Sequence, residues 1–161
     1  MTPSLTLRPA TSADDQLLFE IYASTRAAEL EQVPWTDEQK SSFVLQQHVA
    51  QHSAYHQRHP DGQFLVIEHD GASVGRLYRA TLDGGEIRLL DIALLPEHCG
   101  QGIGTALLRD LMAEVDGGAM TLSLHVEFWN PALRLYERLG FIEAGRNDVH
   151  VRMEYRPTRL S

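Results

Sequence analysis

The chain has 161 residues, of which 43% are hydrophobic and 22% are charged, a composition typical of an ordinary globular protein and not of a disordered or fibrous one. A formal net charge of −8 argues against a general binding surface for nucleic acid. The single cysteine excludes an intramolecular disulfide, and no segment has the pattern of a signal peptide or a membrane span. We therefore expect a cytoplasmic protein without a membrane or nucleic-acid partner.

The first part of the chain predicts one short strand followed by two helices. Leu5 and Leu7 alternate with polar residues in a strand that a proline ends. The stretch "TSADDQLLFEIYASTRAAEL" then combines a polar helix start with apolar residues at helical spacing. Thr36 and Gln39 occupy the two positions of a capping box, which predicts a second helix ending at about His56.

The middle of the chain predicts an antiparallel meander. Three β-rich runs are separated by the turn dipeptides Asp70-Gly71 and Gly84-Gly85. The third run, Ile87 to Leu95, is nearly all apolar, so we expect a central strand that is buried on both faces.

The last third alternates helices and strands. A glycine-rich loop and an amphipathic helix come first, and then "GGAMTLSLHVE", "NPALRLYERLG" and the following stretch predict a strand, a helix and a closing pair of strands. No shift in composition marks a linker, and no segment repeats. The sequence thus predicts a single domain over residues 1–161, of the mixed α/β class.

The glycine-rich loop places Gly100, Gly102 and Gly104 within five residues at the start of a predicted helix. Backbone N–H groups in such a position bind phosphate oxygens, assisted by the helix dipole. A tight turn with close helix packing is the alternative explanation for the glycines. The loop lacks the lysine of a P-loop, and its spacing and late position differ from a dinucleotide-binding fingerprint. A pyrophosphate loop for an acyl-coenzyme A is the third interpretation.

Two segments together resemble the GNAT superfamily of acetyl-coenzyme A-dependent N-acetyltransferases. In "DIALLPEHCGQGIGTALL", the strand end at Leu94, Leu95 and Pro96 is similar to that of the family. Gly102 and Gly104 match the glycines of its Arg/Gln-x-x-Gly-x-Gly/Ala loop. The stretch "NPALRLYERLGF" matches the second family signature at Asn130, Ala132, Tyr136, Gly140 and Phe141.

The resemblance extends from residue 5 to about residue 155. It implies the GNAT-like fold, whose central, mostly antiparallel and splayed sheet is flanked by helices. It also implies an acyltransferase that moves an acetyl group from acetyl-CoA directly to a primary amine in a ternary complex, without a metal. A non-catalytic sensor or scaffold module that binds coenzyme A is the alternative, and a protein that binds another phosphate compound is a third class.

The resemblance also assigns roles to individual residues. The backbone of Ile92, Ala93 and Leu94 would pair with the pantetheine arm as an added strand does, and an amide there would polarise the thioester carbonyl. Tyr136 would face the sulfur, unless it is only a core aromatic residue. Cys99 replaces the usual Arg or Gln, which we expect to alter coenzyme affinity without abolishing binding. The implied coenzyme-binding residues are Ile92, Ala93, Leu94, Cys99, Gly100, Gln101, Gly102, Ile103, Gly104, Thr105, Asn130 and Tyr136.

The group that removes the proton from the amine stays open. An alkylamine with a pKa of ~10.4 is almost entirely protonated near neutral pH, so a base or a chain of waters must take its proton. His125 lies five residues before Asn130, where some members of the family carry their proton acceptor. Asp91 and Glu127 are the alternatives, and a water chain without a dedicated base is another.

The acceptor also stays open between a small-molecule amine and the N-terminus or a lysine of a protein. The resemblance places the acceptor pocket at the first two helices, where Trp35 is either a pocket wall or a cap on the core. Glu29 and Glu31 either attract a cationic amine or are simply solvated. A further helical stripe, formed by His48, His52, His56 and the nearby His59, is expected to be a polar flank and not a metal site. Homodimers are common in the superfamily, so a homodimer is a further possibility.

Overall fold

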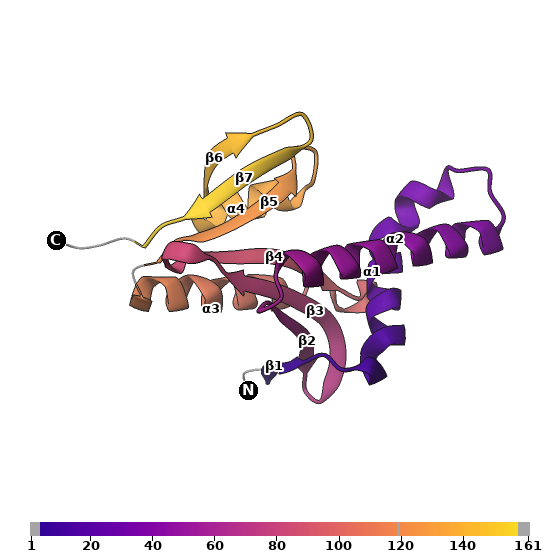
Figure 1. The fold of residues 1–161 in the computed structure, drawn as a ribbon, viewed down its shortest axis with the longest axis horizontal. Coiled ribbons are helices and arrows are strands. Elements are labelled where there is room, and N and C mark those ends of the chain that lie inside the picture. Colours follow the sequence, from indigo (N-terminus) through magenta and orange to yellow (C-terminus); the bar gives the residue numbers. More distant parts are fainter. Residues whose placement is uncertain (1–3, 119, 158–161) are drawn as a thin grey trace. The chain divides into compact units, whose positions relative to one another are not determined.

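The computed structural model describes residues 4–118 and 120–157. Figure 1 shows their helices and strands. In chain order these are β1 (Leu5–Pro9), η1 (Ser12–Asp14), α1 (Asp15–Glu31), α2 (Asp37–Arg58), β2 (Gln63–His69), β3 (Ala72–Thr81), η2 (Asp83–Gly85), β4 (Ile87–Leu94), η3 (Pro96–His98), α3 (Ile103–Gly118), β5 (Leu122–Glu127), α4 (Ala132–Leu139), β6 (Ile142–Arg146) and β7 (His150–Tyr155).

The strands are hydrogen-bonded in the order β1-β2-β3-β4-β5-β7-β6. The pair β4–β5 is parallel, whereas β1–β2, β5–β7 and β6–β7 are antiparallel. The predicted mixed α/β class, with a mostly antiparallel sheet and helices, is confirmed. None of the helices in the described part of the chain is long and apolar enough to cross a membrane.

The chain divides into two compact units, which are described separately. The first consists of Met1–Tyr78 and Asp91–Gly104, and the second of Arg79–Leu90 and Thr105–Ser161. Because the boundaries fall inside β3, β4 and α3, each of these elements contributes residues to both units.

The first unit is built on the β1–β2 ladder and the helices α1 and α2. Leu5 pairs with His69 and Pro9 with Leu65, and a tight turn with positive φ at Asp70 and Gly71 leads from β2 into β3. Its buried apolar side chains come from both helices and from the strands. They are Leu18, Ile21, Tyr22, Val44, Val66, Ile67, Val74, Leu77 and Tyr78, together with Ile103 at the start of α3.

The predicted capping box at the start of α2 is confirmed. The Thr36 side chain accepts a hydrogen bond from the Gln39 amide at 3.1 Å, and the Gln39 side chain accepts one from the Thr36 amide at 2.9 Å. The helix ends at Arg58, two residues beyond the predicted His56.

In the second unit, β4 pairs with β5 from Ile87–Leu122 to Leu89–Leu124, and β5 pairs with β7. Alternation gives this part of the sheet one apolar and one polar face. The buried apolar residues of the unit are Ala80, Ile87, Leu89, Leu107, Leu108, Leu111, Val115, Leu122, Leu124, Val126, Tyr136, Phe141, Val151 and Met153.

The expectation that the third apolar run is buried on both faces is wrong. Ile87 and Leu89 are buried, whereas Arg88 and the residues from Leu90 to Leu95 are only partly buried. The physical reason is visible at Arg88, whose guanidinium lies on the polar sheet face and binds the side chains of Glu86 and Ser123.

Asp14 joins the end of β1 to the first helical turn of the chain. Its carboxylate accepts two hydrogen bonds from Arg8, at 2.9 and 2.8 Å, and a third from the Thr11 amide at 2.8 Å. The Arg8 hydrogen bond, followed by that of Thr11, lowers the pKa of Asp14 from 3.8 to about 2. The ionised form of Asp14 therefore stabilises the folded state.

We predict that Asp14→Asn lowers the free energy of unfolding at pH 7 by about 1–2 kcal/mol, as expected for a lost cap and ion pair. Because the folded-state pKa is depressed, this contribution is complete above pH 3.8 and disappears as the pH falls towards 2. Urea unfolding at a series of pH values measures it. The control is Asp15→Asn at the neighbouring exposed carboxylate, and equal stability losses for the two variants would contradict the assignment.

Candidate active site

The glycine loop leads from η3 into α3 and adopts a conformation that two of its glycines permit. Gly100 has a φ of 77° and Gly102 a φ of 81°, both in the left-handed region that side chains disfavour. A Cβ atom built at Gly100, Gly102 or Gly104 would meet nothing within 4 Å. Turn conformation thus accounts for Gly100 and Gly102, while the described part of the chain leaves the space beside the loop open.

The loop presents a row of backbone donors. Within residues 4–118 and 120–157, no backbone or side-chain atom accepts a hydrogen bond from the amides of Gly100, Gln101 or Gly102. The amides of the first turn of α3, which starts at Ile103, follow directly, and first-turn amides have no acceptor inside their own helix. The arrangement offers several N–H groups and the positive end of a helix dipole to an anion.

The side chains of the loop contact their own backbone. The exposed Cys99 thiol lies 3.7 Å from the Leu94 carbonyl oxygen and 3.6 Å from that of Leu95. The Gln101 amide donates to the Glu97 carbonyl at 3.2 Å.

The strand segment before the loop carries one charged candidate. Ile92, Ala93 and Leu94 are partly buried. Asp91 accepts a hydrogen bond from the Nε of Arg76 at 2.5 Å, and Arg76 itself is 2% exposed. The sequence analysis did not single out Arg76, although an arginine between apolar residues of a predicted strand was the available signal.

Tyr136 and Asn130 belong to the second unit, as do Thr105 and His125. Tyr136 is 8% exposed on α4, with its ring 5.6 Å from that of Phe141. The Asn130 side-chain oxygen accepts from the Ala132 amide at 2.9 Å and so supports the start of α4. Its side-chain amide donates to Glu127 at 2.9 Å, so this alternative base is tied to the same turn.

His125 lies exposed on β5, opposite Arg152 in the β5–β7 ladder. Loss of hydration on the sheet face lowers its pKa below 6.5, and the charges of Arg88, Arg152 and His150 lower it further. Glu86 acts in the opposite direction. The imidazole is therefore neutral near pH 7, the state in which it can accept a proton.

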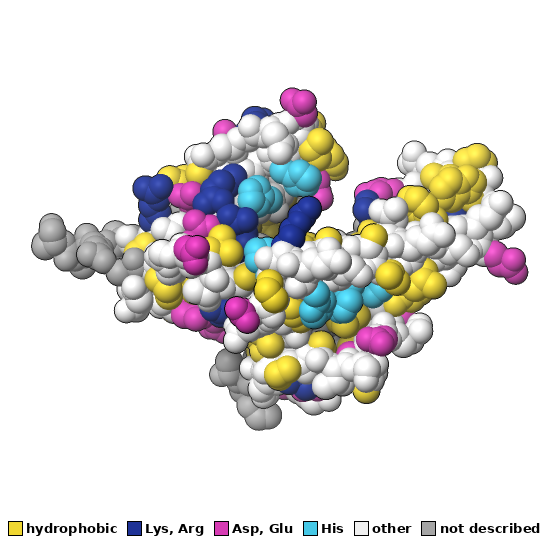
Figure 2. Space-filling model, viewed as in Figure 1, with side chains coloured by type: hydrophobic (Ala, Val, Ile, Leu, Met, Phe, Trp, Pro, Cys, Tyr) yellow, Lys and Arg dark blue, Asp and Glu magenta, His cyan; other side chains and the backbone are white. Residues whose placement is uncertain are grey.

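A charged network shares the polar face of this sheet with His125. Glu86 accepts from Arg88 and from Arg152, each at 3.0 Å, and from the Ser123 hydroxyl at 2.8 Å. Figure 2 shows basic and histidine side chains gathered over the strands of the second unit. Sequence reasoning missed this network. Polar residues at every second position of these strands were its only signal.

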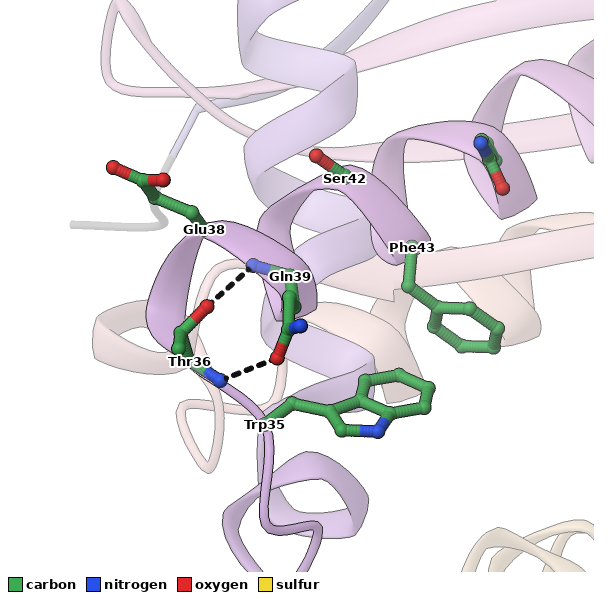
Figure 3. A pocket seen from close by; sticks show the side chains of 7 residues that line it. Trp35, Thr36, Glu38, Gln39, Ser42 and Phe43 are labelled. Carbon is green, nitrogen blue, oxygen red and sulfur yellow. Dashed lines mark hydrogen bonds between the residues drawn. The ribbon is translucent and has the colours of Figure 1, made fainter.

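Trp35 in the loop between α1 and α2 and Phe43 in α2 form an exposed aromatic pair. Trp35 is 42% and Phe43 is 38% exposed, with ring centroids 5.3 Å apart. Both line a cavity of about 600 Å³ beside the Thr36–Gln39 capping box, while the Glu38 carboxylate points away from the rings (Figure 3). Of the two interpretations of Trp35, the exposed pocket wall fits the structure and the core cap does not.

The histidine stripe lies along α2 and is held together by ring contacts (Figure 2). The His48 and His52 centroids are 6.2 Å apart, those of His52 and His56 are 4.3 Å apart, and His56 stacks on Phe64 at 3.9 Å. Burial is the main cause that lowers the pKa of His48 and of His52. Among the described residues, no three or more His, Cys, Asp and Glu side chains are grouped so as to hold a metal ion.

Comparison with known proteins identifies the class to which this fold and loop belong. The model of the acetyltransferase (GNAT) domain family matches residues 60–143, more than half of the chain. The chain belongs to the GNAT acetyltransferase family.

Individual relatives lie within the same family. The [ribosomal protein bS18]-alanine N-acetyltransferase of Escherichia coli K12 is 41% identical over 75 residues, which cover 45% of this chain and 47% of that protein. The chain thus spans about half the length of the relatives that it matches in this way. A Bacillus subtilis protein, provisionally given the same name, is 34% identical over 135 residues, covering 80% of this chain and 74% of its own length.

Among solved structures, the PaiA N-acetyltransferase of Thermoplasma acidophilum, in complex with coenzyme A, is similar with a TM-score of 0.70. It is 18% identical, and the superposition covers 95% of this chain and 99% of that one. This likeness shows the fold alone.

We predict that the His125 imidazole titrates below pH 6.5 in the folded protein. Arg152→Met removes a positive charge that disfavours the imidazolium, so the pKa of His125 should rise by up to about one unit. Histidine NMR titration measures both values. Arg146→Met, at an exposed arginine paired with Glu143, is the control and should leave the titration unchanged. A His125 pKa that ignores the Arg152 substitution would contradict the electrostatic account.

Proposed function

We propose that this protein is an N-acetyltransferase, one domain over residues 1–161, that moves an acetyl group from acetyl-CoA directly to a primary amine. The observation that carries the proposal is the row of amides from Gly100 into α3, which has no acceptor among the described residues. A diphosphate supplies the acceptors and the negative charge that such a row favours.

Acetyl-CoA fits the chemistry of these residues. The loop from Cys99 to Thr105 would hold the diphosphate. Asn130 and Tyr136 are the further coenzyme-binding residues that we propose. The backbone of Ile92–Leu94 would pair with the pantetheine arm. One amide there, aimed at the thioester oxygen, would lower the barrier by ~2.7–4 kcal/mol if it resembles other oxyanion donors. The coenzyme itself supplies the activated acetyl thioester.

His125 is the base that we propose, because its lowered pKa keeps it neutral at pH 7. Asp91 is bound to a buried guanidinium, and Glu127 is bound by Asn130, so both carboxylates already serve another contact. Tyr136 would donate a hydrogen bond to the departing thiolate. Full proton transfer from a tyrosine of pKa ~10 to a thiolate whose thiol has a pKa of ~8.5 costs roughly 2 kcal/mol, so the ammonium of the tetrahedral intermediate supplies the final proton more easily.

The acceptor that we propose is the α-amino group of a polypeptide. The support is that relatives of this chain are named as alanine N-acetyltransferases of a ribosomal protein. Such an acceptor would place the reaction in the cytoplasm. The Trp35–Phe43 cavity on the α1–α2 loop is the candidate contact for the chain behind the amine.

The decisive experiment measures thiol release from acetyl-CoA when a peptide with an N-terminal alanine is added. Mass spectrometry then locates the acetyl group. We expect Tyr136→Phe to lower the turnover number at least tenfold while leaving the acetyl-CoA KM within twofold. Tyr155→Phe is the control, since that hydroxyl donates to Asp116 at 2.9 Å and serves stability only. Coenzyme binding without thiol release for any amine would favour the sensor instead.

A second prediction separates the phosphate role of the loop from its turn conformation. Gly102→Ala and Gly71→Ala each place a side chain at a left-handed φ, of 81° and 85°, with nothing within 4 Å. Both should therefore lose a similar ~1–2 kcal/mol of stability. Only Gly102→Ala should weaken acetyl-CoA binding, by at least fivefold in titration calorimetry, because the strained loop moves its amides. Equal affinities for the two variants would count against a phosphate loop.

A further inference from the structure

The first unit encloses an arginine that no proposed chemical step uses. Arg76 lies on β3 and is 2% exposed, among the largest fully buried side chains of the described residues. Its guanidinium donates to Asp91 of β4 at 2.5 Å and to the Gln51 side chain of α2 at 2.9 Å. It also lies over two rings, 5.6 Å from the centroid of Tyr22 and 4.9 Å from that of Tyr78.

Through these contacts the positive charge of Arg76 links four elements, which are β3, β4, α1 and α2. A buried guanidinium is costly unless its donors are satisfied, so the ion pair and the amide contact restrict where Asp91 and Gln51 can lie. The planar guanidinium, with its fork of N–H donors, fixes the directions of two hydrogen bonds at once, which a lysine ammonium does not. The two aromatic faces fix the plane of the fork. Asp91 is consequently held at one point of β4, directly before Ile92.

Gly75, the residue before Arg76, restricts the position of the backbone in the same part of β4. A Cβ atom at Gly75 would overlap the Ala93 carbonyl oxygen and lie 2.8 Å from Leu94 Cδ2. The Leu95 amide donates to the Val74 carbonyl at 2.8 Å. The backbones of β3 and β4 therefore approach at Ala93 as closely as only a glycine allows.

We propose that Arg76 is a positioning residue which, through Asp91 and together with the close approach at Gly75, fixes the backbone of Ile92–Leu94 in the geometry that binds the coenzyme arm. The inference rests on the proposed function for the role of that backbone. It assigns Asp91 to orientation of β4 and not to proton transfer.

The test compares variants that remove the charge, the fork or both partners. Arg76→Met deletes the charge and leaves Asp91 without its arginine, whereas Arg76→Lys keeps a charge without the fork. The double variant Arg76→Met with Asp91→Asn removes both charges, so it should regain thermal stability relative to Arg76→Met. The control is Arg79→Met on the same strand, because Arg79 binds Glu114 with two bonds of 2.7 and 2.8 Å and has no part in the proposed positioning of β4.

Two measurements are made on each variant. Hydrogen–deuterium exchange without coenzyme reports the order of amides 92–95, and titration with acetyl-CoA reports its dissociation constant. We expect Arg76→Met and the double variant to exchange these amides at least tenfold faster and to bind acetyl-CoA at least tenfold more weakly. Arg76→Lys should lie between them and the parent protein, and Arg79→Met should match the parent in both measurements.

The outcomes separate this inference from the proposed function. If the double variant regains stability and also native exchange and affinity, Arg76 has no positioning role. The inference is also overturned if the exchange rates and acetyl-CoA affinities of all variants, Arg79→Met included, simply follow their melting temperatures. If Arg76→Met does not fold, Arg76→Lys and the double variant decide. A third outcome is that the Arg76 variants exchange amides 92–95 faster, but the parent protein does not bind acetyl-CoA. That result would support the role of Arg76 in ordering β4 and would contradict the proposed transferase function.

Discussion

Unsatisfied backbone amides are the constraint on which the site depends. A folded chain ordinarily pairs its N–H groups, yet those of Gly100, Gln101 and Gly102 donate to nothing in the described residues and run directly into the first turn of α3. Exposed to water, such donors cost little. Gathered at a helix start beside open space, such donors suit an anion without the help of a charged side chain. In the proposed site, Cys99 in place of Arg or Gln is tolerable for this reason.

Charge is distributed so that each unit keeps a different group in a defined state. In the first unit, a fully buried guanidinium fixes the carboxylate of Asp91. In the second, Arg88 and Arg152 bind Glu86 and also disfavour the imidazolium form of His125. In the mechanism that we propose, the arginine-bound Asp91 orients β4, whereas the neutral His125 takes the proton. Membership of the GNAT family is consistent with this division but does not dictate which residue is the base.

Sequence patterns predicted those structural features that depend only on residues close together in the chain. The capping box of Thr36 and Gln39, the turn at Asp70-Gly71 and the left-handed glycines of the loop are each decided within a few residues, so the sequence shows them directly. The order of strands and helices was predictable for the same reason. The helix predicted from "TSADDQ" begins instead as a short 3-10 turn, because Asp14 closes its own capping box with Thr11 before α1 starts.

What the sequence by itself determined is therefore the element order, the glycine-rich loop before α3 and the family, since all three rest on contiguous motifs. The tertiary structure alone decided that Ile87–Leu94 has a polar face, that Arg76 meets Asp91 fifteen residues away, and that Arg152 meets Glu86 across sixty-six residues. These contacts depend on strand register, which a shift of one residue would reverse. Register is set by the packing of the whole sheet, and periodicity in a single segment carries no record of it.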